Sequence, residues 1–154
     1  MNWAKRSAFF LISVACFLAD YYSKYWALTE LGARKIVVNT YMNFILAFNH
    51  GAAFSFLARA GGWQRWLFAG FAGIVALWLI MTLLTKSHHW LMSVSYACIL
   101  GGAVGNLYDR VVYGYVIDFI QWHYRTFYWP VFNLADVAIT LGVILMLIAE
   151  LHRR

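Results

Sequence analysis

Two aspartates lie in apolar surroundings in the C-terminal part of the chain. Asp118 stands in the sequence Val-Ile-Asp-Phe-Ile and Asp136 in Phe-Asn-Leu-Ala-Asp-Val-Ala-Ile, although the chain has only six acidic residues. No Lys or Arg lies within four residues of Asp118, and none lies near Asp136. Two carboxylates placed together share a proton, which leaves a neutral acid beside an ionised base that can activate water for hydrolysis. We therefore predict that Asp118 and Asp136 form a catalytic pair.

The elements that must position this pair are apolar helices. Hydrophobic residues make up 64% of the 154 residues and charged residues 12%, whereas about 25% is usual in soluble domains. Four segments are long enough, or nearly so, to cross a hydrocarbon core that requires ~20 apolar residues: 7–26, 66–84, 90–108 and 131–149. The sequence predicts a single domain, 1–154, that is an all-α membrane protein with four transmembrane helices.

Two connecting segments are too polar or too interrupted to span. Residues 34–57 contain β-branched and aromatic runs, the last at 54–57, separated by Asn39-Thr40 and Asn49-His50-Gly51. These predict short strands in a small extracytoplasmic sheet, because an open sheet in lipid would leave main-chain groups unpaired. Residues 111–130, between the third and fourth helices, are aromatic and partly polar, and we expect them to lie in the membrane interface.

The net charge of +6 is best explained by membrane topology. The twelve Lys and Arg are scattered, mostly outside the apolar segments, so nucleic acid is not an expected partner. The N-terminus, the 85–89 loop and the C-terminal tail are short and dense in positive charge, which favours both termini in the cytoplasm. Alternatively, the first segment is a cleaved signal peptide, since Lys5 and Arg6 precede it, but Asp20 and Lys24 would then lose their helix.

Other polar residues recur at helical spacing. Asp20, Ser23 and Lys24 share one helix face, as do Asn106, Asp109 and Arg110. We expect Asp20 to pair with Lys24 and Asp109 with Arg110 in structural roles. In the last helix the polar residues Asn133, Asp136 and Thr140 form one stripe. In the third helix the small residues 101–105 allow another helix to pack closely.

Other chemistries find little support. Neither an H-E-x-x-H motif nor a cysteine cluster accompanies His50 and His123, so no metal or other cofactor is expected, and G-x-S-x-G is absent. The main alternative function is a small transporter or proton-relay subunit, for which intramembrane carboxylates are equally typical. A relay should stagger its carboxylates through the membrane, whereas these aspartates all fall near one interface. A purely structural scaffold would leave the pair unexplained.

Five motifs in register give the chain a family resemblance. They are Asp20-x-x-Ser23-Lys24, the Asn49-His50-Gly51-Ala52-Ala53-Phe54 run, residues 101–110 (GGAVGNLYDR), Val116-Ile117-Asp118-Phe119 and Phe132-Asn133-Leu134-Ala135-Asp136. Together they resemble the bacterial lipoprotein signal peptidases, aspartyl proteases of the inner membrane. Tyr21 stands where that family often has Gln and Val137 where Ser is frequent, and neither is a carboxylate.

The resemblance implies a function and a set of roles. The family removes the signal peptide from prolipoproteins, cleaving on the amino side of a cysteine that carries diacylglycerol, without a cofactor. Carried over, Asp118 and Asp136 are the catalytic pair. Asn49, Asn106, Arg110 and Asn133 hold the substrate or orient the carboxylates, and Asp20, Lys24 and Asp109 support the site. The expected partners are these precursors and membrane lipid, and the protein is expected to be a monomer in the inner membrane with its site near the outer face.

Overall fold

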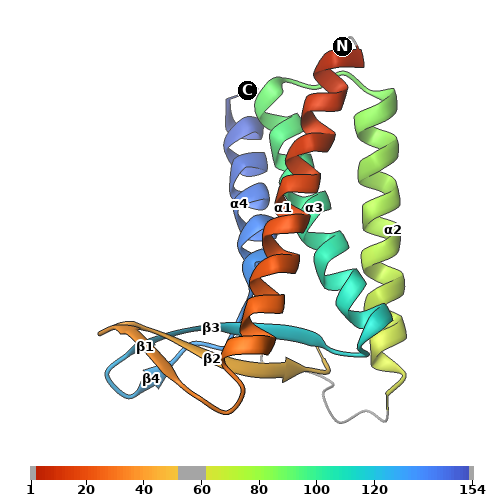
Figure 1. The fold of residues 1–154 in the computed structure, drawn as a ribbon. Helices are drawn as coiled ribbons and strands as arrows, with labels where there is room; N and C mark the ends of the chain where they lie inside the picture. Colours follow the sequence, from red (N-terminus) through yellow and green to blue (C-terminus); the bar gives the residue numbers. More distant parts are fainter. Residues whose placement is uncertain (1–2, 52–61, 153–154) are drawn as a thin grey trace.

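A bundle of four helices carries a small sheet at one end (Figure 1). The computed structural model describes residues 3–51 and 62–152. The helices are α1 (Trp3–Glu30), α2 (Gln64–Thr85), α3 (Trp90–Val112) and α4 (Leu134–Leu151). Both ends of the chain lie at the end of the bundle opposite the sheet (Figure 1). The four predicted apolar segments are therefore helical.

Three of the four helices, α2, α3 and α4, are long and apolar enough to cross a membrane. The other, α1, has the length but includes the charged residues Asp20 and Lys24, which are both buried inside the bundle. Lipid-facing side chains of α2 and α4, such as Phe71, Ile74 and Leu147, are exposed. Apolar side chains on the outside and charged ones on the inside are the arrangement that a hydrocarbon solvent favours.

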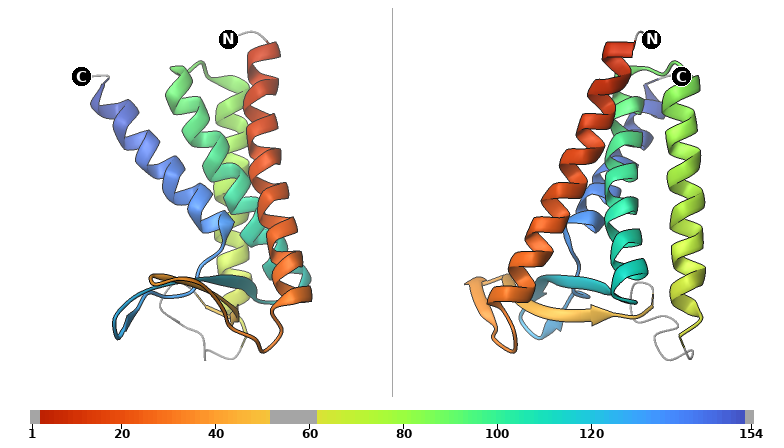
Figure 2. Two further views of the ribbon diagram at one scale, coloured as in Figure 1. Left: turned by 60° about the vertical axis from the view of Figure 1, so that its left-hand side comes forward. Right: turned by 45° about the vertical axis from the view of Figure 1, so that its right-hand side comes forward.

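Close helix packing depends on glycines of α3. A Cβ on Gly101 would lie 2.5 Å from the main-chain oxygen of Ser13 in α1, and a Cβ on Gly102 would collide with the main chain of Ala135 in α4. The predicted small-residue surface is thus confirmed, and it serves two neighbours at once. Helix α4 packs against α3 and diverges from α1 toward its C-terminus (Figure 2).

The sheet contains more of the chain than the sequence analysis predicted. Its antiparallel strands run in the order β1 (Ile36–Asn39), β2 (Met42–Asn49), β3 (Val116–Tyr124) and β4 (Phe127–Tyr128). Strands β1 and β2 confirm the strands expected between 34 and 49, whereas the one expected at 54–57 lies outside the described residues. Most of the segment 111–130, which we expect to lie in the membrane interface, forms β3 and β4, because β2 offers β3 a partner for its main-chain groups.

Candidate functional site

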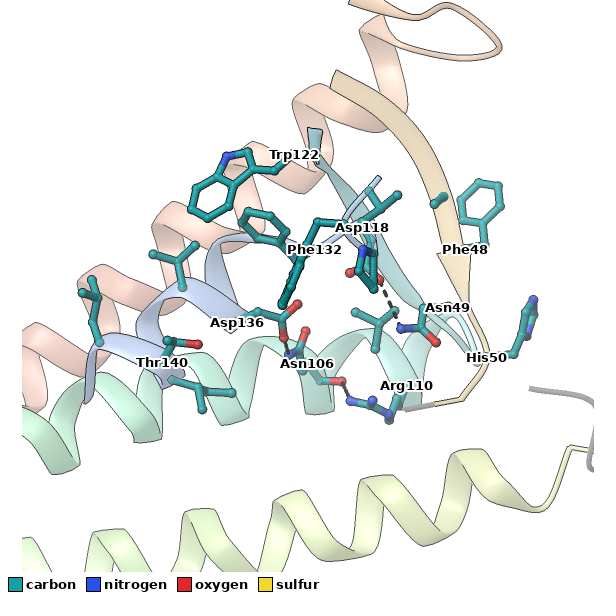
Figure 3. Close-up of a pocket in the computed structure, with 18 residues that line it drawn as sticks. Phe48, Asn49, His50, Asn106, Arg110, Asp118, Trp122, Phe132, Asp136 and Thr140 are labelled. Carbon is teal, nitrogen blue, oxygen red and sulfur yellow. Dashed lines mark hydrogen bonds between the residues drawn. The ribbon is translucent and has the colours of Figure 1, made fainter. Parts of the chain in front are cut away.

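The site is a cavity of about 760 Å³ between the sheet and the outer ends of α3 and α4. Asn49 and Asp118 enter it from the sheet, Asn106 and Arg110 from α3, and Asp136 from α4 (Figure 3). Its remaining walls are mostly apolar and aromatic, including Phe48, Val116, Trp122, Trp129, Pro130, Val131, Phe132, Val137, Ile139 and Leu141. Two carboxylates thus share a largely apolar cavity.

Asp118 is placed by strand pairing. It lies opposite Ala47 of β2, and it is only 3% exposed. One carboxylate oxygen accepts a hydrogen bond from Nδ2 of Asn133 at 2.7 Å. The other accepts one from Nδ2 of Asn49 at 3.2 Å, which Figure 3 shows as a dashed line. Both bonds come from amides, and no Lys or Arg of residues 3–51 and 62–152 forms an ion pair with this carboxyl group.

Asp136 is placed by the start of α4. Asn133 is the N-cap of this helix, and its side-chain oxygen accepts from the main-chain N–H of Asp136 at 2.9 Å. The Asp136 carboxylate accepts from the main-chain N–H of Asn133 at 3.3 Å and from Nδ2 of Asn106 at 2.8 Å. This reciprocal capping box stabilises the helix end, and the helix dipole favours negative charge there.

Two asparagine side chains connect the carboxylates. Nδ2 of Asn133 donates to Asp118, and it also lies 3.1 Å from Oδ1 of Asn106, whose own amide donates to Asp136. Asn133 is fully buried. The two aspartates are therefore oriented by one amide network rather than by separate contacts.

A buried ion triad supports this network from behind. Nζ of Lys24 lies 2.6 Å from Asp20 and 2.8 Å from Asp109, and it donates to Oδ1 of Asn106 at 3.2 Å. Asp20 also accepts from the main-chain N–H of Ala135 at 2.8 Å, and Asp109 from that of Ile117 at 3.1 Å. Asp20 thus fixes the main chain one residue before Asp136, and Asp109 fixes it one residue before Asp118.

The electrostatic setting distinguishes Asp118. Burial raises the pKa of Asp118 to about 7, and the nearby Asp136 carboxylate adds to the rise. The hydrogen bonds from Asn49 and Asn133 oppose this shift because they favour the charged form. The expected neutral acid is thus supported at Asp118 near neutral pH. Among the described residues, no group of three or more His, Cys, Asp or Glu side chains is arranged to hold a metal ion.

The structure brings all nine predicted site residues to one end of the bundle, with one change of partner. Arg110 does not pair with Asp109 in the described structure: it donates to the main-chain oxygen of Asn106 at 3.1 Å, and Asp109 binds Lys24. Asp109 points into the bundle, whereas Arg110 lines the cavity. The sequence indicates that some aromatic residues of 113–132 line a cleft but not which ones; the structure places Trp122, Trp129 and Phe132 in the cavity wall.

Fold and site together define a membrane protein with several apolar helices and a paired-carboxylate site, and the comparisons with known proteins specify its family. The family model described as Signal peptidase (SPase) II matches residues 12–152. The chain belongs to this family, and it is therefore a peptidase.

Individual relatives agree with this assignment. The lipoprotein signal peptidase of Ralstonia nicotianae is 49% identical over 116 residues, covering 75% of this chain and 67% of the relative. That of Pseudoalteromonas atlantica is 42% identical over 145 residues, covering 91% and 87%. A bacterial membrane enzyme solved by the in meso method at 2.3 Å resolution has a TM-score of 0.83 and 30% identity, over 95% of this chain and 88% of that one.

Proposed function

We propose that this protein is an aspartic endopeptidase that removes the signal peptide from diacylglyceryl-modified prolipoproteins, cleaving on the amino side of the modified cysteine. The observation that carries the proposal is that Asp118 and Asp136 face one cavity and are joined through Asn133. Family membership supports the substrate, and the geometry supports the chemistry.

The two aspartates divide acid and base catalysis between them. Because burial favours the neutral form of Asp118, this residue holds the shared proton before reaction and donates it to the oxygen of the scissile carbonyl. Asp136, at the N-terminus of α4, is the ionised base that takes a proton from the attacking water. After this step Asp136 carries a proton and Asp118 is ionised, so as the C–N bond of the intermediate breaks Asp136 donates its proton to the leaving nitrogen and Asp118 takes one from the hydroxyl that becomes the new carboxyl group.

The residues around the pair hold the substrate and the carboxylates. Arg110 lines the cavity and provides donors for a substrate carbonyl, while its contact with the Asn106 main chain limits its motion. Asn49 orients Asp118, and Asn106 and Asn133 orient both aspartates. Asp20, Lys24 and Asp109 do not line the cavity, and they act by fixing the elements that do.

The surroundings of the cavity suit a lipid-modified substrate. Helix α4 contributes Val137, Ile139 and Leu141 to the cavity wall, so one side of the cavity follows an apolar, membrane-length helix. Acyl chains of the modified cysteine would lie in this region while the scissile bond reaches the aspartates. Each methylene buried in the bilayer contributes about 0.8 kcal/mol to membrane anchoring, so two chains hold the precursor at the depth of the cavity.

We place the protein in the bacterial inner membrane, with four spans, both termini in the cytoplasm and the site near the outer face. The length of α1, its inward-facing charges and the common location of the termini support four spans (Figure 1). The described residues of one chain provide both aspartates and the cavity, which is consistent with a monomer. A proton relay is less well supported, because Asp20, Asp109, Asp118 and Asp136 gather in one hydrogen-bonded cluster rather than along the membrane normal.

The test is cleavage of a synthetic prolipoprotein peptide, with and without diacylglycerol on its cysteine, by purified protein. We expect cleavage of the modified form and loss of turnover in Asp118→Asn and Asp136→Asn, with the double variant no worse than either single one because the pair acts as a unit. Glu30→Gln, at an exposed carboxylate at the end of α1, should be fully active. Substantial turnover by either folded Asn variant, or equal cleavage of the unmodified peptide, would contradict the proposal.

A further inference from the structure

Thr140 is a polar residue of the cavity to which the proposed chemistry gives no task. It lies four residues after Asp136 on α4, so both side chains project from one face of the helix. Thr140 lines the cavity among Val137, Ile139 and Leu141 (Figure 3). A hydroxyl in such apolar surroundings is unfavourable unless it finds a hydrogen-bond partner.

Several other helix hydroxyl groups of this protein show one way in which such a partner is found, although the hydroxyl of Ser93, which is fully buried and outside the cavity, has none among the described residues. Ser13, Ser23, Thr29, Thr85 and Ser95 each donate to a main-chain carbonyl oxygen at 2.6 to 3.3 Å. The Thr140 hydroxyl makes no such bond within the described part of the chain. It is therefore available to a molecule that enters the cavity.

The depth of Thr140 indicates which part of the substrate it meets. Four residues of helix correspond to about 6 Å, so Thr140 lies about one turn farther into the membrane than Asp136. A substrate whose scissile carbonyl lies at the aspartates sends two parts in this direction: the residues on the amino side of the bond, and the acyl chains. Both bring carbonyl oxygens, which accept hydrogen bonds but have no donor in an apolar environment.

We propose that the Thr140 hydroxyl is a substrate-binding group that donates a hydrogen bond to a carbonyl oxygen of the precursor, one helical turn from the catalytic pair. This inference rests on the proposed peptidase function. Thr140 touches no reacting atom, so it contributes binding that is equal in the ground state and the transition state. Its loss should raise KM and leave kcat nearly unchanged.

The experiment compares the kinetics of three variants with those of the unchanged protein. Thr140→Val removes the hydroxyl and keeps the shape, Thr140→Ser keeps the hydroxyl, and Thr85→Val removes a helix hydroxyl that already bonds the Met81 oxygen outside the cavity. We expect Thr140→Val to raise KM about threefold to tenfold, as for one neutral hydrogen bond, with kcat within about twofold. The other two variants should behave like the unchanged protein.

A precursor carrying two ether-linked alkyl chains identifies the acceptor, because it lacks the ester carbonyls. If the effect of Thr140→Val disappears with this substrate, the acceptor is an ester carbonyl, and if the effect persists, it is a peptide carbonyl. Unchanged KM in Thr140→Val, or equal impairment in Thr140→Ser, overturns the inference and leaves the proposed function intact. Failure of the unchanged protein to cleave the lipidated precursor overturns both.

Discussion

The burial of Asp118 makes a quantitative prediction about stability that is independent of any activity assay. Its pKa is raised from 3.8 to about 7, mainly by burial. A carboxyl group with a raised pKa binds its proton more tightly in the folded state than in the unfolded chain. Between pH 4 and 7 the folded protein therefore binds more protons, and its free energy of unfolding falls as pH rises.

The magnitude follows from the size of the shift. About three pKa units at 1.36 kcal/mol each correspond to about 4 kcal/mol lost between pH 4 and 8. Asp118→Asn removes this titration, so the variant should gain stability relative to the unchanged protein over that range. A lost acceptor for Asn49 or Asn133 lowers the stability of the variant by about 1 kcal/mol or more, but by a similar amount at each pH.

The assay is thermal unfolding in detergent, followed by the fluorescence of the eight tryptophans, at pH 4.5, 6 and 8. At about 2–4 °C per kcal/mol for a chain of this size, the difference in Tm between variant and unchanged protein should grow by roughly 10 °C from pH 4.5 to 8. Titrations of groups that do not interact with Asp118 are common to both proteins and cancel in the difference. Asp136→Asn removes a lesser cause of the shift, so in that background the pH effect should shrink but persist. A Tm difference that stays constant with pH would refute the reasoning.

Three further predictions concern the support of the site and its orientation. Lys24→Met leaves two buried carboxylates without their shared cation, so it should lower the free energy of unfolding by about 3–5 kcal/mol. Thermal unfolding of this variant and of the unchanged protein measures the difference. Gly105→Ala places a methyl group 2.5 Å from the carboxylate of Asp20 and should lower both Tm and turnover, whereas Gly70→Ala, with open space around it, should lower neither. In a background lacking the native cysteines, a cysteine replacing Asn39 should react with an impermeant thiol reagent added outside intact cells, and one replacing Ser87 only after the membrane is opened. The reverse labelling pattern would invert the proposed topology.

The helices and the aspartate pair could be predicted because both depend on local sequence. Long apolar runs predict helices wherever they occur, and an aspartate flanked by apolar residues is conspicuous without knowledge of its neighbours in space. The strand at 116–124 is harder to predict from the sequence. Its β-branched and aromatic residues between Gly114 and the turn at Arg125 are typical of a strand, but a lone strand at a membrane surface would leave its main chain unpaired. Its longest pairing is with β2, about 70 residues earlier in the sequence, and spacing along the chain does not reveal that partner.

Asp109 pairs with Lys24 instead of the expected Arg110 for the same reason, since its partner comes from a distant part of the sequence. Arg110 is adjacent in sequence, and local spacing favours it, but the side chains of adjacent helix residues diverge by about 100° around the axis. Asp109 faces α1, where Lys24 is already buried beside Asp20, while Arg110 faces the cavity. Such a partner, supplied by another helix, is invisible to an argument from spacing.

The position of Lys24 explains why three charges are buried so far from water. Burying an ion triad contributes little net stability compared with apolar residues of the same shape, so stability alone does not account for it. Lys24 holds Asp20, which fixes the main chain before Asp136, and Asp109, which fixes the main chain before Asp118. This ammonium group thereby adds a link between α4 and β3, which are also joined by the main-chain pairing of Ile120 with Phe132 and by the side chain of Asn133. Apolar residues in place of all three charges can preserve the fold, but they remove the restraints on the main chain of Ala135 and Ile117 and leave only the asparagine network to orient the two carboxylates. General acid and base groups must act on one substrate bond at hydrogen-bonding distance. The triad is therefore better explained by the geometry of the catalytic pair than by the stability of the bundle.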